Sequence, residues 1–117
     1  MYIAVTADGD NLNSLVSNDF ESATYLLIID LPDLSFEAVK NEGYSAVSMA
    51  KEVIAYDCEA VITGELAPVT FDILAEACVT RYRGAGHTVR KALQMMEDYE
   101  LYIIRNSEGT DTCEEDH

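Results

Sequence analysis

Hydrophobic and polar positions along the chain alternate between the spacing of strands and the spacing of helices. Nearly continuous apolar runs at residues 2–7, 23–31, 60–63 and 79–82 predict strands, and a weaker alternation at 36–40 predicts a short edge strand. Apolar residues recur at helical spacing from 45 to 56, from Pro68 to 77 with Val69, Ile73, Leu74 and Ala77 on one face, and after Thr88. The apolar piece at 101–104 is too short to assign.

The order of these elements predicts how the strands pair. The early strands have no helix between them and must pair antiparallel, whereas the later ones are joined through helices and must be parallel. We therefore expect one α/β domain over residues 1–105, built as a mixed sheet of about five strands with helices on both faces. Residues 106–117 form a polar, acidic stretch that we expect to be a flexible tail.

Parallel strands also predict where a ligand would bind. In open α/β sheets, ligands bind beyond the carboxyl ends of the parallel strands. Here those ends lead into Asp8–Asp10, Gly64–Glu65 and the glycine loop Arg83–His87. We expect these three loops, far apart in sequence, to converge on one edge of the sheet.

The charge balance narrows the range of ligands. The chain has 22 acidic and 7 basic residues, so its formal net charge is -15. Because nucleic acids and anionic membranes attract Lys and Arg, this balance argues against both as partners. Residues 77–96 reverse the sign, with several basic residues and no acidic one. This basic island is where we expect an anionic ligand.

Two of its cations lie where a helix disfavours them. Arg90 and Lys91 fall in the first turn after Thr88, and the helix dipole opposes positive charge there. Together with Arg83 and the backbone amides of residues 84–86, they would suit a phosphate-like or cluster-like anion at a helix N-terminus. The alternative is a solvated pair of cations, balanced by acidic residues elsewhere.

The glycine loop has one side chain able to bind metal. His87 could ligate a metal or hydrogen-bond an anion, although a single loop histidine is more often simply solvated. Gly84 and Gly86 would serve a tight turn as readily as an anion cradle.

The three cysteines form no CxxC pair and are odd in number, which argues against a secreted disulfide framework. Cys58 and Cys78 are expected to be buried structural thiols. Cys113 and His117 are four residues apart and could clamp a soft metal if helical, but a disordered acidic tail is the stronger interpretation. With no signal-peptide pattern and no apolar window of membrane-spanning length, we expect a cytoplasmic protein.

Several stretches together resemble a known family. They are AVTADG at 4–9, VSNDF at 16–20 leading into ATY, ITGELAP at 62–68 and, most specifically, YRGAGHTV at 82–89. Over residues 2–98 the chain resembles the dinitrogenase iron-molybdenum cofactor biosynthesis family, which includes the NifX and NafY type cofactor carriers. The resemblance implies a ribonuclease-H-like fold and a non-enzymatic protein that binds or transfers an iron-sulfur or iron-molybdenum cluster. It also implies a metallocluster biosynthesis or acceptor protein as partner. We expect a monomer or a weak homodimer.

One position departs from the family pattern. The family usually has Ser-x-His-Phe-Gly before the second strand, with the His as a ligand, whereas residues 17–21 read SNDFE. Asp19 therefore replaces the His, and Glu21 the Gly. Carboxylate is a hard ligand, while iron-sulfur clusters favour thiolate and sometimes imidazole. This weakens the case for a cluster at this loop and leaves a second hypothesis, a divergent member that binds a protein partner or a small anion. The residues expected to contact a ligand are Asp8, Asp19, Gly64, Arg83, Gly84, Gly86, His87, Arg90 and Lys91.

A metal-dependent nuclease is a third and weaker hypothesis. Ribonuclease-H-like nucleases gather carboxylates around two magnesium ions, and Asp8 or Asp10 could approach Glu65 across the predicted edge. The intervening helix offers no clear third carboxylate, and the net charge would repel a nucleic-acid substrate. We therefore expect no catalytic residues.

Overall fold

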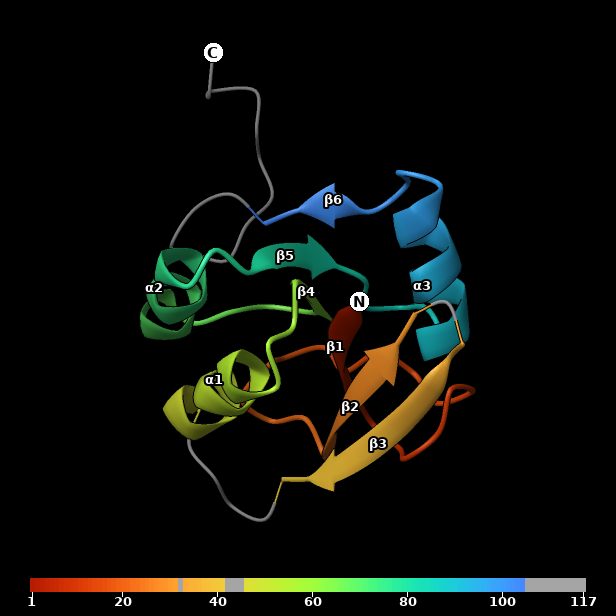
Figure 1. Cartoon of the computed structure of the whole chain (residues 1–117), viewed down its shortest axis with the longest axis horizontal. Helices are drawn as coiled ribbons and strands as arrows, with labels where there is room; N and C mark the ends of the chain where they lie inside the picture. Colours follow the sequence, from red (N-terminus) through yellow and green to blue (C-terminus); the bar gives the residue numbers. More distant parts are fainter. Residues whose placement is uncertain (32, 42–45, 105–117) are drawn as a thin grey trace.

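A computed structural model of the chain describes residues 1–31, 33–41 and 46–104 (Figure 1). Within these ranges the chain forms a six-stranded mixed sheet and three α-helices. Their bounds are β1 Tyr2–Ala7, β2 Tyr25–Asp30, β3 Ser35–Lys40, α1 Ala46–Ala55, β4 Ala60–Thr63, α2 Pro68–Glu76, β5 Thr80–Arg83, α3 Val89–Glu97 and β6 Tyr102–Ile103. The sheet has one strand more than the five expected, because the unassigned piece at 101–104 contributes β6.

The strand order is β3-β2-β1-β4-β5-β6. β1 pairs antiparallel with β2, and β2 with β3, while β1, β4 and β5 are parallel neighbours and β6 returns antiparallel. This confirms the pairing expected for the strands up to β5; β6, which was not among the expected strands, is antiparallel although it follows a helix. The direction of winding reverses between β1 and β4, since β2 and β3 lie on one side of β1 and β4 to β6 on the other.

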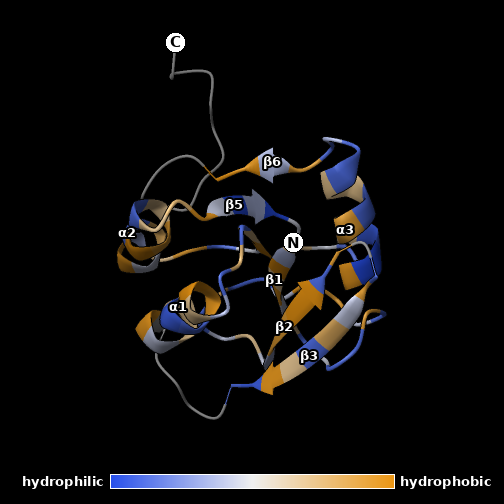
Figure 2. Cartoon of the chain, viewed as in Figure 1, coloured by the Kyte–Doolittle hydropathy of each residue, from blue (hydrophilic) through white to orange (hydrophobic). Residues whose placement is uncertain are grey.

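Helices cover both faces of the sheet, as expected (Figure 1). One core packs α1 and α2 against Ala4, Leu26, Ile28 and Val61; the other packs α3 against the alternate residues of β1, β2 and β4. The four central residues of β2 are buried, which explains its unbroken apolar run. Figure 2 shows β2 hydrophobic along most of its length and β3 mixed.

The buried face of α2 differs from the predicted one. The helix begins at Pro68 as expected, but its buried residues are Thr70, Phe71 and Leu74, while Val69 is 53% exposed. The apolar pattern selected Val69 because threonine counts as polar. Thr70 has nearly the same shape as valine and takes the buried position instead. Phe71, the largest side chain of the helix, sets the buried face.

All three helices end in the same kind of turn. Asp57, Cys78 and Tyr99 each follow a helix with φ of 61 to 63°. The N–H of each of these residues donates to the carbonyl three positions earlier in the chain. The N–H of the following residue donates to the carbonyl five positions earlier than itself, which completes the Schellman pattern. Glycine is the usual residue at this position, and none of the three is glycine.

This turn decides the environment of two cysteines. Cys58 comes just after the left-handed residue and is buried, as expected. Cys78 is itself the left-handed residue and is exposed, so the prediction that it is buried was wrong. The following residue, Val79, takes the buried position instead.

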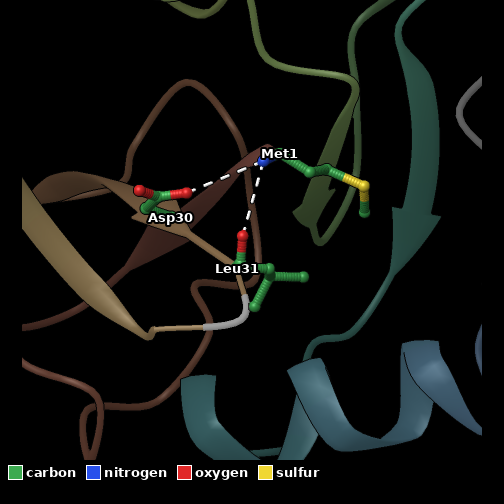
Figure 3. A network of polar contacts seen from close by, with 3 residues as sticks. All are labelled: Met1, Asp30 and Leu31. Atoms are coloured by element: carbon green, nitrogen blue, oxygen red, sulfur yellow. Dashed lines mark hydrogen bonds and ion pairs between the residues drawn. The ribbon is translucent and has the colours of Figure 1, made fainter.

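The start of the chain is joined to the end of β2. The Met1 amine lies 3.6 Å from the Asp30 carboxylate and donates to the Leu31 carbonyl at 3.4 Å (Figure 3). The Leu31 N–H donates back to the Met1 carbonyl at 2.8 Å. The ion pair is exposed and contributes little, so the backbone bond is the main link at this corner.

Candidate ligand-binding edge

A long loop, residues 8–24, crosses the carboxyl edge of the sheet. Its first half places Leu12 and Val16 in the core under α3, and its second half places Phe20 and Ala23 in the core under α1 and α2. The loop therefore passes from one face of the sheet to the other. Its backbone contacts β1 and the start of the β4–α2 loop, at the point where the strand order reverses. Ligands of open α/β sheets usually bind there, but here the chain itself occupies the crevice.

Three buried hydroxyl groups lie beneath this crossing. The Thr6 and Thr63 hydroxyl oxygens, from β1 and β4, are 2.7 Å apart. The Ser17 hydroxyl oxygen lies 2.9 Å from that of Thr6 and 2.7 Å from the Asp19 carbonyl. Because a carbonyl can only accept, the consistent arrangement is a chain of hydroxyls that ends at Asp19. All three residues are fully or almost fully buried, so this chain satisfies their polar groups.

Gly64 lets the loop approach β4 closely. The Glu65 N–H donates to the Asn18 carbonyl at 2.7 Å, and the Phe20 N–H donates to the Glu65 carbonyl at 2.9 Å. A Cβ on Gly64 would collide with the Asn18 backbone. Asp19 and Glu65 are thereby paired in a short parallel bridge. The structure thus brings Asp19 and Gly64 together.

The N-terminus of α3 is closed by the same loop. Thr88 caps the helix as predicted, because its hydroxyl accepts from the Lys91 N–H at 3.1 Å. The Val89 and Arg90 N–H groups donate to the Ser14 and Leu12 carbonyls at 2.8 and 2.9 Å. The first amides of α3 therefore already have protein acceptors, and an anion could use them only by displacing the loop.

The basic island divides into separate groups. Arg83 and His87 line one surface hollow of about 280 Å³, with Ala85, Met95, Glu100, Leu101 and Tyr102. Arg90 lines another, of about 240 Å³, beside Leu31 and Leu34. Lys91 is exposed and lies one helical turn before Met95, on the side of α3 that borders the first hollow. The structure therefore groups Arg83 with His87 and separates them from Arg90.

Arg81, the remaining cation of the island, has a structural role. Its guanidinium lies 4.6 Å from the centre of the Phe71 ring and donates to the Val79 and Ile104 carbonyls at 2.6 and 3.3 Å. Partial burial lowers the pKa of Arg81, although an arginine remains charged. These contacts hold the end of β6 against β5 and α2.

The two glycines of the loop have different reasons to be glycine. A Cβ on Gly84 would meet the Ile62 side chain, and the Gly84 N–H already donates to the Thr63 carbonyl at 2.8 Å. Gly86 is exposed, has φ of +95° and has no neighbour where a Cβ would lie. Gly84 therefore serves packing and Gly86 serves the turn.

Potential metal ligands are sparse at this edge. His87 is half-buried, and its backbone carbonyl accepts from the Val16 N–H at 2.9 Å. Cys58 and Cys78 lie at the opposite, amino edge. In the described part of the chain, no three His, Cys, Asp or Glu side chains are grouped so that they could hold a metal ion. Cys113 and His117 fall outside the described residues.

The carboxylates proposed for a nuclease gain no support. Asp8 and Asp10 are exposed at the end of β1, and the Asp8 N–H donates to the Leu15 carbonyl at 2.9 Å. Among the described residues, no third carboxylate is grouped with these residues and Glu65.

Of the helices described, none is long and apolar enough to cross a membrane.

Tyr102 was not among the predicted site residues. This side chain is exposed and lines the hollow of Arg83 and His87. Its position depends on β6, which pairs Tyr102 with Arg83, and the two-residue strand is too short to predict from its pattern.

The fold is a small mixed α/β domain whose loops after β1, β4 and β5 lie at one edge of the sheet. Residues 1–99 match the model of the dinitrogenase iron-molybdenum cofactor family, and the chain belongs to this family. The family consists of small proteins that are linked to iron-molybdenum cofactor biosynthesis or resemble carriers of that cofactor. No curated protein matches the chain.

Solved structures agree with this assignment. The chain resembles the apo form of the orange protein of Desulfovibrio gigas, with 25% identity and a TM-score of 0.81, over 90% of this chain and 93% of that one. A Thermotoga protein provisionally named NifB, solved by NMR, is 26% identical with a TM-score of 0.78 and 97% coverage of both chains. A protein of Methanocaldococcus jannaschii provisionally named a dinitrogenase shares the fold, with 24% identity and a TM-score of 0.74, over 91% and 96% of the two chains.

Proposed function

We propose that this protein is a non-enzymatic carrier that holds an iron-sulfur or iron-molybdenum cluster, or a precursor of one, at its carboxyl edge. The observation that carries the proposal is the hollow shared by Arg83 and His87. It combines an imidazole, which can ligate iron, with a cation that favours an anionic cluster. Family membership supports the choice of cargo.

The donors favour transient holding over permanent ligation. In the described residues this edge has one imidazole and no thiolate, whereas resident iron-sulfur clusters are usually held by several cysteines. A carrier must release its cargo to an acceptor, so a single ligand assisted by charge suits transfer. Asp19 on the crossing loop and Glu65 on the β4–α2 loop lie beside each other, and two carboxylates there repel an anionic cluster. The hollow of His87 has one carboxylate, Glu100, and one cation, Arg83, which favours that side of the edge.

A second candidate is a member that binds a small anion without a cluster. Asp19, where the family usually has a histidine, favours it, because a carboxylate is a poor ligand for a soft cluster. Both candidates place the ligand at Arg83 and His87, so one set of variants tests the location and two ligands test the chemistry.

The experiment is anaerobic mixing with a preformed iron-sulfur cluster, followed by desalting, visible spectroscopy and metal counting. We expect the wild type to retain metal, and His87→Ala and Arg83→Gln to retain much less. Arg90→Gln is the matched control, since Arg90 lines a different hollow and should retain metal as the wild type does. Equal retention by all four proteins would place the cluster elsewhere.

A parallel titration with inorganic phosphate tests the second candidate. If the wild type keeps no metal but binds phosphate, and Arg83→Gln binds it more weakly, the protein is an anion binder. If neither ligand binds, both proposals fail. Circular dichroism of each variant checks that the fold is unchanged.

A further inference from the structure

The outer edge of β3 is a long open strand edge. Among the described residues, β3 ends the strand order on one side with six residues, and β6 ends it on the other with two (Figure 1). β3 pairs with β2 at every residue, without a bulge. Natural edge strands are usually protected by Pro, bulges, several charges or shortness. β3 has no Pro and carries Glu37 and Lys40 as its charges.

Two hydrogen bonds show which residues of β3 point their backbone groups outward. The Asn41 N–H donates to the Thr24 carbonyl at 2.9 Å, in continuation of the β2–β3 register. The Leu31 N–H donates to Met1, so the odd-numbered residues of β2 face β1 and the even-numbered ones face β3. Both hydrogen bonds therefore indicate that the backbone N–H and C=O groups of even-numbered β2 residues pair with those of odd-numbered β3 residues. The N–H and C=O groups of Phe36, Ala38 and Lys40 therefore point away from the sheet.

We propose that β3 pairs antiparallel with β3 of a second copy, about a two-fold axis at Ala38. In this register Ala38 faces its own copy, and Phe36 faces Lys40 of the second copy. All the outward backbone groups of Phe36, Ala38 and Lys40 then have partners. The two sheets become one continuous sheet.

Side chains select this register over its neighbours. A two-fold axis at Glu37 would set two carboxylates directly opposite each other, which is destabilising. An axis at Val39 would leave only residues 38–40 of each strand overlapping. With the axis at Ala38, Glu37 faces Val39 of the second copy, and the aliphatic stem of Lys40 lies against Phe36, which is 40% exposed in the single chain. Tyr56 holds the Glu37 carboxylate on the α1 side through a 3.1 Å hydrogen bond.

The net charge of each chain opposes dimerisation and predicts how the dimer responds to salt. Each chain carries a formal net charge of -15, so two copies repel, although Glu37 and Lys40 leave the strand itself neutral. Salt screens this repulsion over about 8 Å at physiological ionic strength. Association through β3 should therefore strengthen with added salt, whereas an interface built on ion pairs would weaken.

The dimer leaves the ligand-binding edges open. A two-fold axis perpendicular to the sheet reverses the strands, so the carboxyl edges of the two copies point in opposite directions. Dimerisation is therefore independent of the proposed carrier function, and either can fail without the other.

Sedimentation velocity from about 10 μM to about 1 mM tests the proposal, because an interface of one strand is small and its affinity low. We expect a monomer–dimer equilibrium that shifts toward dimer when NaCl is raised. Ala38→Pro removes the N–H at the two-fold axis, at an edge position where Pro is tolerated. It should leave a monomer at every concentration.

Two further variants guard against a folding defect. Ala38→Asp keeps the backbone donor but sets like charges opposite each other, and should also be monomeric. Ala38→Val, the matched control, keeps the N–H and should dimerise as the wild type does. Circular dichroism of each variant checks the fold. A wild type that stays monomeric at both low and high NaCl concentration overturns the proposal. So does a dimer that survives Ala38→Asp, or one that added salt weakens.

Discussion

The two edges of the parallel strands differ in where glycine is found. At the amino edge, three residues with positive φ close the helices, and they are Asp57, Cys78 and Tyr99. At the carboxyl edge, Gly64 and Gly84 have no positive φ, and they stand where a Cβ would strike a neighbour. Gly64 and Gly84 are thus glycine because space is short, whereas the helix ends accept left-handed strain where space is open. Gly86, with φ of +95° and no neighbour, is the exception at the carboxyl edge.

This difference reflects what each edge must do. The carboxyl edge has a loop crossing between two cores, with backbone against backbone at Asn18 and Gly64. The amino edge has helix ends facing solvent, where a strained residue costs roughly 1 to 2 kcal/mol and harms no packing. A side-chain rotation cannot move the Asn18 backbone aside, so glycine is needed at residue 64.

Gly64→Ala should have the largest effect. The added Cβ meets the Asn18 backbone, which cannot move without breaking the Glu65-to-Asn18 hydrogen bond. We expect a loss of about 3 kcal/mol or more in the free energy of unfolding, at the upper end for overpacking. Urea denaturation measures it. Gly86→Ala is the control: it has strain but no neighbour, and should lose only about 1 kcal/mol. Equal losses in the two variants would contradict the comparison.

Cys58 should make the amino edge sensitive to alkali. Burial and the nearby Asp57 carboxylate raise the pKa of the Cys58 thiol from 9.0 to about 11. Well below pH 9 the thiol is protonated in both the folded and the unfolded chain, so its ionisation takes nothing from the free energy of unfolding. As the pH rises toward about 11 the unfolded thiol ionises first, and about 2 to 3 kcal/mol of stability is lost.

Urea denaturation of the wild type and Cys58→Ala at pH 8 and pH 11 isolates this thiol. The difference in stability between the two proteins should shrink at pH 11, because the variant has no thiol to ionise. A difference that stays constant between these pH values would show that Cys58 ionises equally easily in both states.

Gly84→Ala should cost less than Gly64→Ala. Its Cβ would meet the Cγ2 methyl of the buried Ile62 side chain and not a backbone group. We expect a loss of about 1 to 2 kcal/mol, measured by urea denaturation. Adding Ile62→Leu should recover part of it, because leucine lacks the Cγ2 methyl that the new Cβ would meet. If Ile62→Leu only adds to the loss, the contact with Ile62 is not the cause.

Much of this fold could be predicted because its signals are local. The runs at 2–7 and 60–63 coincide with β1 and β4, and Thr88 caps α3 as its position suggested. The prediction for Cys78 was wrong because the left-handed turn is usually marked by glycine, and here it is not. The strand β6 was missed because two residues carry no periodicity.

The site was harder to predict because it depends on one loop. Parallel strands correctly placed the loops after β1, β4 and β5 at one edge. The pattern could not show that residues 8–24 cross that edge and occupy the amides of α3. Nor could it show that Arg90 lines a hollow with Leu31 and not with His87, since Arg90 lies only three residues after His87.

Tyr99→Gly should give the smallest effect, and in the opposite direction. Tyr99 is 94% exposed with φ of 61°, so glycine relieves left-handed strain without removing a packed side chain. The relief is roughly 1 to 2 kcal/mol, and the greater freedom of glycine in the unfolded chain offsets about 0.5 to 1 of it. We expect a net gain of about 0.5 kcal/mol, measured by thermal and urea denaturation. Tyr99→Ala, which keeps the strain, should show no gain. A gain in both variants would mean that the tyrosine side chain is unfavourable in itself, and the contrast between the two edges would then rest on Asp57 and Cys78 alone.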